Sequence, residues 1–380
     1  MRIPRRALPP ALLLTALIGA SLAHLATDVS ARQASSARHL GSRPETVVWG
    51  EIPIGRPPAL TIASGETVTI DTLTHAGATQ NQEPEAYLKA LGVARTEILP
   101  DMLDFWASRP SRPREGRSGH ILTGPIYVEG AAAGDVLEIQ VLDLSLRLPW
   151  GMNSSGPAGG VLGTGYPGTR PGDPVPATGN RLVRTGFDNG QPVAFVTPSV
   201  RVPLRPFMGI MAVAPPYPRV GQPGITVDGV QATRPPGVFG GNLDVKDLAA
   251  GSTLFLPVFH DGAQFYVGDP HSVQGDGEVN GTAVEQSLTG RFRLVLHKNR
   301  ALRAPRAETA THHIVMGIDV DLDRAMRLAV QEAVDFLVQE KGLSPADAYL
   351  LASIGCDFRV GEAVDLTQVV TGHIPKAIFR

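Results

Sequence analysis

The segment FYVGDPHSVQGDGEV, residues 265–279, contains four side chains that can bind a metal ion or transfer a proton. They are Asp269, His271, Asp276 and Glu278, and the glycines between them leave the backbone free to turn. One imidazole among several carboxylates is a ligand set that suits Zn²⁺ or another first-row divalent ion. Carboxylates outside the ligand set could act as general bases. The alternative is that Asp and Gly simply form turns here, since Asp-Gly is a common hairpin signal.

A second polar segment, GVFGGNLDVKDL, precedes the first and carries Asn242 and Asp244. One predicted β-hairpin separates the two segments. Antiparallel strands joined by short turns bring such loops to one end of a sheet, so we expect Asn242 and Asp244 to lie near His271. Taken together, the two segments favour a site over a pair of plain turns.

A third segment, GRSGHILTGPIYVEG, places His120 and Glu129 on either side of a predicted strand. The imidazole of His120 could join the metal or hold a substrate. The alternatives are a hydrogen-bonded surface histidine and a solvated glutamate at a strand end. His75, in DTLTHAGATQNQ, is a weaker candidate that gains weight only if it faces the same pocket.

The elements that must position these side chains are mostly short strands. Runs of β-branched residues alternate with Gly, Pro and Ser breaks, which predicts a mainly β fold. The segments VEGAAAGDVLEIQVLDL and VKDLAAGSTLFLPVFHDG share one order of residue types, a weak internal repeat. This repeat favours a duplicated β-sandwich or barrel-like architecture, with possible β subdomains at 47–230 and 231–380. The Gly- and Pro-rich stretch 150–190 is predicted to be a long loop.

Strong helical patterns are confined to the C-terminal region. DLDRAMRLAVQEAVDFLVQEKG carries an apolar stripe at helical spacing, with Asp321 or Asp323 as its N-cap and Gly342 at its end. SPADAYLLASIG predicts a second helix, with Ser344 as its N-cap and Gly355 at its end. With the strand candidates that follow, the two helices predict a C-terminal α+β segment.

The N-terminus indicates export from a bacterial cytoplasm. MRIPRR supplies positive charges, an apolar stretch follows, and VSA, ending at Ala31, is an acceptable cleavage site. Residues 1–31 are therefore predicted to be a signal peptide, and 32–46 a disordered leader. We expect a periplasmic or secreted protein with no stable membrane association after processing. An uncleaved N-terminal anchor is the alternative.

Charge and cysteine usage exclude other classes. The formal net charge of −2 leaves no electrostatic footprint for nucleic acid, so no nucleic-acid partner is expected. Cys356 is the single cysteine of the chain and cannot form an internal disulfide. Its apolar, helical surroundings are typical of a buried structural thiol and not of a nucleophile.

Four stretches carry a resemblance to a known family: SGHILTGPIYVEGAAAGDVLEIQVLDL, PFMGIMAVAPP, FGGNLDVKDLAAGSTLFLPVFHDGAQFYVGDPHSVQGDGEVNGTAVE and the closing IPKAIF. From about Val47 to the C-terminus, the chain resembles the acetamidase/formamidase family. The resemblance implies hydrolysis of a short-chain amide to a carboxylic acid and ammonia, on a β-rich fold. It also implies a divalent metal, with zinc as the first candidate, and a homo-oligomer, with a dimer as the expected form.

The family's polar motif positions fall on eight residues of this chain: His120, Glu129, Asn242, Asp244, Asp269, His271, Asp276 and Glu278. We predict that Asp244, Asp269 and His271 bind the metal, and that His120 and Asn242 contact the substrate. Glu129, Asp276 and Glu278 are the predicted catalytic carboxylates, with Glu129 or Glu278 as the proton carrier. Two other hypotheses remain: an exported metal- or ligand-binding protein without turnover, and a hydrolase of an ester or a cyclic amide.

Overall fold

The computed structural model describes residues 38–112, 118–155, 160–162, 179–219, 221–222, 224–225 and 229–380. The predicted signal peptide, residues 32–37 of the predicted leader, and residues 156–159 and 163–178 of the predicted loop 150–190 lie outside this part of the chain. Residues Arg38–Arg380 form one unit. Within the described ranges, no helix combines the length and the apolar character needed to cross a membrane.

The largest sheet has nine strands and contains both halves of the sequence. Its spatial order is β1 (Arg38–Leu40), β4 (Thr67–Asp71), β15 (Leu288–His297), β6 (Val136–Leu146), β13 (Thr253–Pro257), β16 (Arg306–Glu308), β17 (His312–Asp319), β19 (Gln368–Pro375) and β18 (Asp357–Glu362). Neighbours are antiparallel apart from the parallel pair β1 and β4. Strands from before and after residue 230 are therefore interleaved at β4, β15, β6 and β13.

A six-stranded sheet packs against the first. Its order is β12 (Gly240–Asn242), β11 (Phe207–Ala212), β14 (Phe265–His271), β5 (Ile121–Val128) and β2 (Val47–Trp49), with β3 (Leu60–Ile62) also paired to β5. Residues of both sheets share one hydrophobic core, in which the rings of Phe265 and Phe292 lie 6.3 Å apart. Every residue of β14 is buried, so this strand is enclosed on both faces. The prediction of a mainly β fold is confirmed.

The internal repeat has a structural counterpart. The first copy leads from β5 into β6, and the second leads from the end of β12 into β13. Each copy thus passes from the six-stranded sheet to the nine-stranded sheet, and β6 and β13 pair with each other there. A third sheet, with the order β10 (Val200–Pro203), β9 (Gln191–Thr197), β8 (Gly179–Asp188) and β7 (Trp150–Ser155), is built from local hairpins.

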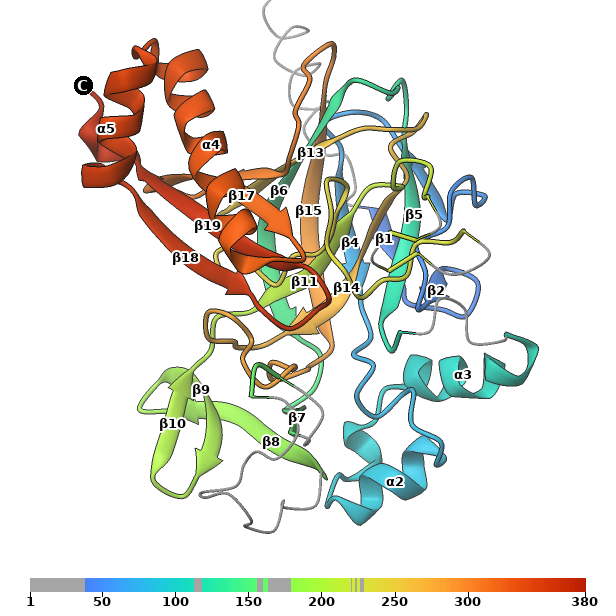
Figure 1. The fold of residues 1–380 in the computed structure, drawn as a ribbon. Coiled ribbons are helices and arrows are strands. Elements are labelled where there is room, and N and C mark those ends of the chain that lie inside the picture. Colours follow the sequence, from blue (N-terminus) through green and yellow to red (C-terminus); the bar gives the residue numbers. More distant parts are fainter. Residues whose placement is uncertain are drawn as a thin grey trace, which may run out of the picture. The chain divides into compact units, whose positions relative to one another are not determined.

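The predicted C-terminal helices are present as α4 (Leu322–Lys341) and α5 (Pro345–Gly355), which lie beside β17, β18 and β19 (Figure 1). Asp321 caps α4 by accepting a hydrogen bond from the Arg324 N–H, and Gly342 ends it with φ of 69°, a conformation that favours glycine. Ser344 caps α5 in the same way. Buried side chains of both helices pack on strands β17 and β19.

The other helices among the described residues are short: α2 (Pro84–Ala90), α3 (Pro100–Ser108), and the 3₁₀ turns η1 (Arg95–Glu97), η2 (Arg109–Ser111) and η3 (Lys376–Ile378). One expectation needs correction. Residues 38–46 were predicted to belong to a disordered leader, but Arg38–Leu40 forms β1, which pairs with β4, and Leu40 is buried. Strand pairing and the burial of Leu40 hold this segment in place.

Candidate functional site

One end of the six-stranded sheet gathers the polar side chains that the sequence analysis selected. β12 ends at Asn242, and Asp244 lies just beyond it. Asp269 and His271 are among the last three residues of β14. His120 directly precedes β5, which runs antiparallel to β14. At this end of the sheet, β12 and β14 finish and β5 begins, as their antiparallel pairing requires.

The nine-stranded sheet supplies the opposite side of the site. His75 follows β4, Glu285 precedes β15, and Glu362 ends β18, with Asp365 three residues further on. Glu285 and His271 also form an isolated antiparallel bridge, which joins the two sides through the backbone. The site thus lies where two sheets converge, and each sheet contributes both imidazole and carboxylate groups.

His271 lies at the centre of the cluster and is fully buried. Its Nε2 lies 3.1 Å from Oε1 of Glu285 and 3.3 Å from Oδ2 of Asp269. Its Nδ1 lies 3.7 Å from Oδ1 of Asp244. The ring of Phe207 packs edge-on against the imidazole, with the centroids 5.0 Å apart, and so limits its rotation.

Asp269 connects His271 to two further imidazoles. Its Oδ1 lies 3.8 Å from Nδ1 of His75 and 3.9 Å from Nε2 of His120, and the two rings are 5.6 Å apart. His75 Nδ1 also lies 3.7 Å from Oε2 of Glu285. His75 therefore faces the same pocket, which was the condition that would strengthen its candidacy.

An oxygen-rich group adjoins the histidines. Ligand oxygens of Asp244, Glu278, Glu362 and Asp365 all lie within 4.8 Å of one another. The backbone N–H groups of Val364 and Asp365 donate to Oε1 of Glu362, and the side chain of Asn242 donates to Oδ2 of Asp365. Asn242 therefore orients a carboxylate, whereas the sequence predicted that it contacts the substrate.

Local backbone geometry supports this crowding of carboxylates. Asp244, Asp269 and Glu278 have φ angles of 47°, 51° and 44°, in the left-handed region that residues other than glycine rarely adopt. Such strained residues concentrate at functional sites. Gly209 of β11 makes the space: a Cβ there would lie 2.7 Å from Oδ2 of Asp269 and closer still to Oδ1 of Asp244.

Burial and mutual repulsion set the protonation of the carboxylates. Burial raises the pKa of Asp244 well above its usual range, and the charges of Glu278 and Asp269 raise this pKa further. Burial likewise raises the pKa of Glu278 well above normal, and neighbouring carboxylates add to the effect. Burial, together with Asp365, raises the pKa of Glu362 to about 8. Without a cation, burial and mutual repulsion favour the protonated forms of these groups, and Glu362 keeps its proton at neutral pH.

The histidines of the cluster also have shifted pKa values, and for them the shift favours the charged form. Burial lowers the pKa of His271, but the charges of Glu285 and Asp269 outweigh burial, and the net pKa lies well above normal. His75 follows the same balance and has a raised pKa. Burial raises the pKa of Asp269, but His120 and His271 outweigh it and hold the net pKa well below its usual range. Asp269 is therefore an ionised carboxylate among imidazoles.

Many buried ligand atoms of this cluster form no hydrogen bond within the described residues. They are His75 Nδ1, Asp244 Oδ1 and Oδ2, Asp269 Oδ1, His271 Nδ1 and Nε2, Glu285 Oε2 and Glu362 Oε2. Leaving so many buried polar atoms without partners is costly, and a bound cation removes that cost.

Ligand atoms also cluster at metal-binding distances in four groups, which are His75–His120–Asp269, Asp269–His271–Glu285, Asp244–His271–Glu278 and Asp244–Glu278–Glu362–Asp365. The residues thus fit a divalent metal, with mixed nitrogen and oxygen ligands around His271 and oxygen ligands around Asp365.

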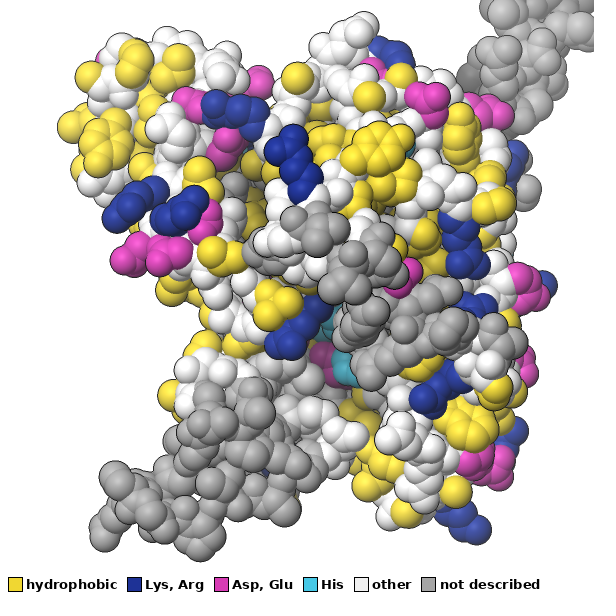
Figure 2. Space-filling view, turned by 45° about the vertical axis from the view of Figure 1, so that its right-hand side comes forward, with side chains coloured by type: hydrophobic (Ala, Val, Ile, Leu, Met, Phe, Trp, Pro, Cys, Tyr) yellow, Lys and Arg dark blue, Asp and Glu magenta, His cyan; other side chains and the backbone are white. Residues whose placement is uncertain are grey.

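A cavity of about 240 Å³ opens onto this cluster, and His75, His120, Asp269, Glu278, Glu285 and Asp365 lie in its wall. Figure 2 shows histidine and acidic side chains at the bottom of a hollow, beside a basic side chain. Arg234 also lines the cavity, where its Nε donates to Oδ1 of Asp365 at 3.1 Å. The cavity is smaller than most ligand pockets, so it suits a small polar molecule.

Two predicted catalytic carboxylates lie away from the cluster. Glu129 is exposed and follows β5, so the eight residues of that strand separate it from His120. Asp276 has a side chain 38% exposed and forms an ion pair of 2.8 Å with Lys246. The expectation that Asp276 and Glu278 face one pocket assumed extended backbone, but Gly277 and Glu278 have φ angles of 86° and 44°. Of this pair, only Glu278 points into the site.

Three buried carboxylates of the site were not predicted: Glu285, Glu362 and Asp365. Glu285 lies in TAVEQSL and the other two lie in VGEAVDL, segments without a histidine or a cluster of acids. An acid in a short segment without basic residues was the available signal, because such a residue is rarely buried without a partner.

Comparisons with known proteins agree with this architecture. The model of the acetamidase/formamidase family matches residues 115–219 and 224–380. An acetamidase from Mycolicibacterium smegmatis is 31% identical over 212 residues, and a formamidase from Methylophilus methylotrophus is 27% identical over 202 residues. Each match covers 42% of this chain, and 49% and 47% of those relatives, so it spans about half of their length.

A solved structure matches over a much greater length. An acetamidase from Yersinia enterocolitica superposes on 92% of this chain and 95% of its own, with a TM-score of 0.71 and 27% identity. The shared fold therefore extends over nearly the whole chain.

Proposed function

Because the chain belongs to the acetamidase/formamidase family, we propose that it hydrolyses the C–N bond of a short-chain amide, releasing ammonia and a carboxylic acid. The observation that carries this proposal is the set of buried, unpartnered imidazole and carboxylate atoms at the end of a small polar cavity. The relatives named above as acetamidase and formamidase support the same reaction type.

We propose a divalent metal as cofactor, with zinc as the first candidate. The ligand atoms of Asp269, His271 and Glu285 lie within 4.8 Å of one another, and mixed nitrogen and oxygen ligands suit zinc. His75 and His120 flank Asp269 and could complete the set. A divalent ion held there supplies Lewis-acid activation of the amide carbonyl and of the attacking water.

Glu278 is the best candidate for a proton carrier among the described residues. It lines the cavity, its Oε1 lies 3.9 Å from Nε2 of His271, and its pKa is raised well above normal by burial. A raised pKa favours the protonated form, and a protonated carboxyl group can deliver its proton to the leaving nitrogen. Asn242 and Arg234 both donate to Asp365, and they hold that carboxylate in place beside Glu278.

Ammonia release from a panel of formamide, acetamide and larger amides tests this function directly. We expect turnover of the smallest amides, loss of turnover after chelation, and recovery on adding a divalent ion. Stoichiometric binding of an amide with no ammonia would instead support an exported binding protein. Release of an alcohol or an amino acid from esters or lactams, without ammonia from any linear amide, would support a different hydrolase.

We also propose that the mature protein is exported to the periplasm or beyond, and that it forms a homo-oligomer. The signal-like N-terminus supports the first proposal, and family resemblance supports the second. Fractionation of the host should find protein beginning near Arg32 outside the cytoplasm, and cytoplasmic protein that retains Met1 would contradict export. Sedimentation analysis should give a mass of at least twice the chain's mass.

A further inference from the structure

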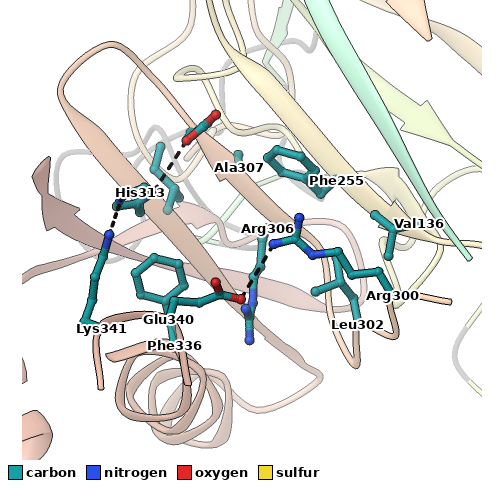
Figure 3. Close-up of a pocket in the computed structure, with 12 residues that line it drawn as sticks. Val136, Phe255, Arg300, Leu302, Arg306, Ala307, His313, Phe336, Glu340 and Lys341 are labelled. Carbon is teal, nitrogen blue, oxygen red and sulfur yellow. Dashed lines mark hydrogen bonds and ion pairs between the residues drawn. The ribbon is translucent and has the colours of Figure 1, made fainter. Parts of the chain in front are cut away.

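A second cavity, of about 270 Å³, lies between α4 and strands β16 and β17, and shares no residue with the cavity described above (Figure 3). Aromatic and aliphatic side chains form much of its wall: Val136, Phe255, Leu302, Ile314 and Phe336. Three cationic side chains, Arg300, Arg306 and Lys341, also line it. The cavity thus combines an apolar wall with positive charge.

Lys341 lacks a carboxylate partner among the described residues. Its Nζ lies 3.4 Å from Nε2 of His313, 5.6 Å from the ring centroid of Phe336 and 4.7 Å from that of Phe379. The pKa of His313 is lowered by burial and then by the charges of Lys341 and Lys376, so the imidazole is neutral at pH 7. The ammonium group of Lys341, which contacts a neutral imidazole and two phenyl rings, can therefore still donate hydrogen bonds to an anion.

Arg306 is a second donor with unused capacity. Its side chain is 13% exposed, and one Nη2 nitrogen lies 3.3 Å from Oε2 of Glu332. Its Nε is buried and has no hydrogen-bond partner in the described part of the chain. A buried guanidinium N–H without an acceptor is rare in folded proteins, and an acceptor in the cavity would remove the penalty.

The acids near the cavity neutralise these donors only in part: Glu332 pairs with Arg306 and Glu340 with Arg300, and neither pairs with Lys341 in the described residues. Oε2 of Glu308 lies 3.1 Å from Nζ of Lys376 and 3.5 Å from Nδ1 of His313. Glu340 pairs with Arg300 at 3.6 Å, and both side chains are largely exposed, at 40% and 52% (Figure 3). Exposed pairs of this kind contribute little to stability, so another carboxylate can replace Glu340 on Arg300.

We propose that this cavity binds a small organic carboxylate with an apolar body, such as an aromatic carboxylate. The carboxylate group meets Lys341, while the apolar body packs against Phe336 and Phe255. Arg306 and Arg300, on the other side of Phe336, add positive charge to the cavity (Figure 3). The volume is near the lower limit for ligand sites, which restricts the ligand to a few non-hydrogen atoms beyond one ring. This inference does not depend on the proposed amide hydrolysis.

Isothermal titration calorimetry of the full chain with benzoate tests the proposal, with benzyl alcohol and acetate as comparison probes. Benzyl alcohol keeps the ring and removes the charge, and acetate keeps the charge and removes the ring. We expect benzoate to bind, and each comparison probe to bind at least about tenfold more weakly. No benzoate binding at about 10 mM, or equal affinity for either comparison probe, would overturn the proposal.

Variants locate the binding. Lys341→Gln should weaken benzoate binding by at least about tenfold, because it removes a charge-assisted contact. Arg324→Gln is the matched control, since Arg324 lies on the same helix, is 64% exposed and pairs only with Asp319 in the described residues. Arg300→Gln, at an exposed position, repeats the test if Lys341→Gln fails to fold by circular dichroism. Wild-type affinity in the cavity variants would assign the binding to another place and refute the inference.

Discussion

Nε2 of His271 lies 3.1 Å from Oε1 of Glu285, although the two residues are fourteen positions apart and belong to segments of different sheets. His271 ends β14 of the six-stranded sheet, and Glu285 leads into β15 of the nine-stranded sheet. Their contact therefore shows that the two sheets come together at the site. Substitution of either residue should therefore lower metal affinity more than it lowers the stability of the hydrophobic core.

Glu285→Gln should lower metal affinity by about two orders of magnitude, and amidase activity with it. Outer partners of metal ligands alone are typically worth about 10- to 100-fold in affinity or activity, and Glu285 lies among the ligands themselves. Metal content after dialysis, measured by mass spectrometry, checks the first effect, and ammonia release checks the second.

Asp276→Asn is the matched control, because Asp276 is exposed and pairs with Lys246 at the surface. This variant should keep wild-type metal content and activity. If it loses metal while Glu285→Gln does not, the ligand set lies on the Asp276 side of the loop and the assignment of Glu285 is wrong.

Parts of the fold could be predicted from the sequence, namely those in which the hydrophobic pattern and the capping residues agree with the tertiary structure. The apolar stripe and caps of α4 predicted its boundaries closely, since Asp321 and Gly342 satisfy the helix ends in the structure. Asn242, Asp244 and His271 lie near one another as predicted, but the predicted hairpin is absent, because β13 belongs to the nine-stranded sheet. They meet because β12 and β14 both pair antiparallel with β11.

The residues that the nine-stranded sheet contributes to the site could not be predicted from the sequence in this way. Glu285, Glu362 and Asp365 reach the cluster only through the order of strands in the nine-stranded sheet, which non-local pairing decides. Glu129 was selected because it follows a strand that begins beside His120, but the strand's length carries it away from the site. Asp276 was misplaced because the turn at Gly277 breaks the alternation of an extended chain.

Glu278→Gln should keep the metal and lower the rate constant of hydrolysis by roughly 10²- to 10⁴-fold. The amide side chain preserves size but cannot pass a proton to the leaving nitrogen. Steady-state ammonia release with metal content measured on the same sample separates the two effects. Glu129→Gln serves as the control and should leave the rate unchanged, and a fall in its rate similar to that of Glu278→Gln would restore Glu129 as the proton carrier.

Gly209→Ala should impair metal binding through shape alone. A Cβ at this position would lie 2.7 Å from Oδ2 of Asp269 and closer still to Oδ1 of Asp244, so both carboxylates must move. The expected result is at least about a tenfold loss of metal affinity in a protein that still folds, since overpacking typically costs about 1–3 kcal/mol.

Gly275→Ala provides the comparison, because a Cβ there meets nothing within 4 Å. Gly275 lies in the same polar segment as His271, so the pair of variants separates crowding at the carboxylates from a general effect of replacing glycine. Equal metal affinity in Gly209→Ala and Gly275→Ala would show that Asp244 and Asp269 do not need their observed positions.

The metal-free protein should become less stable as the pH rises from about 5 to about 8. The pKa of Glu362 is about 8 in the fold and lies near 4.5 for an unperturbed glutamate, so the folded state binds more protons across this window. Stability then falls with rising pH, and the raised pKa values of Asp244, Glu278 and His271 act in the same direction. The lowered pKa of Asp269 has the opposite sign, but it acts at pH values below about 4.

Thermal unfolding of chelator-treated protein at pH 5, 6, 7 and 8 measures this dependence, and we expect the midpoint to fall by roughly 3–8 °C across the series. Glu362→Gln should reduce the slope, because the amide keeps the oxygen that accepts the Val364 and Asp365 N–H groups but carries no titratable proton. Metal-loaded protein should show little slope, because a cation stabilises the ionised carboxylates. A midpoint of the metal-free protein that stays level or rises with pH over this range would contradict the raised pKa values, because the folded state would then bind no more protons than the unfolded state.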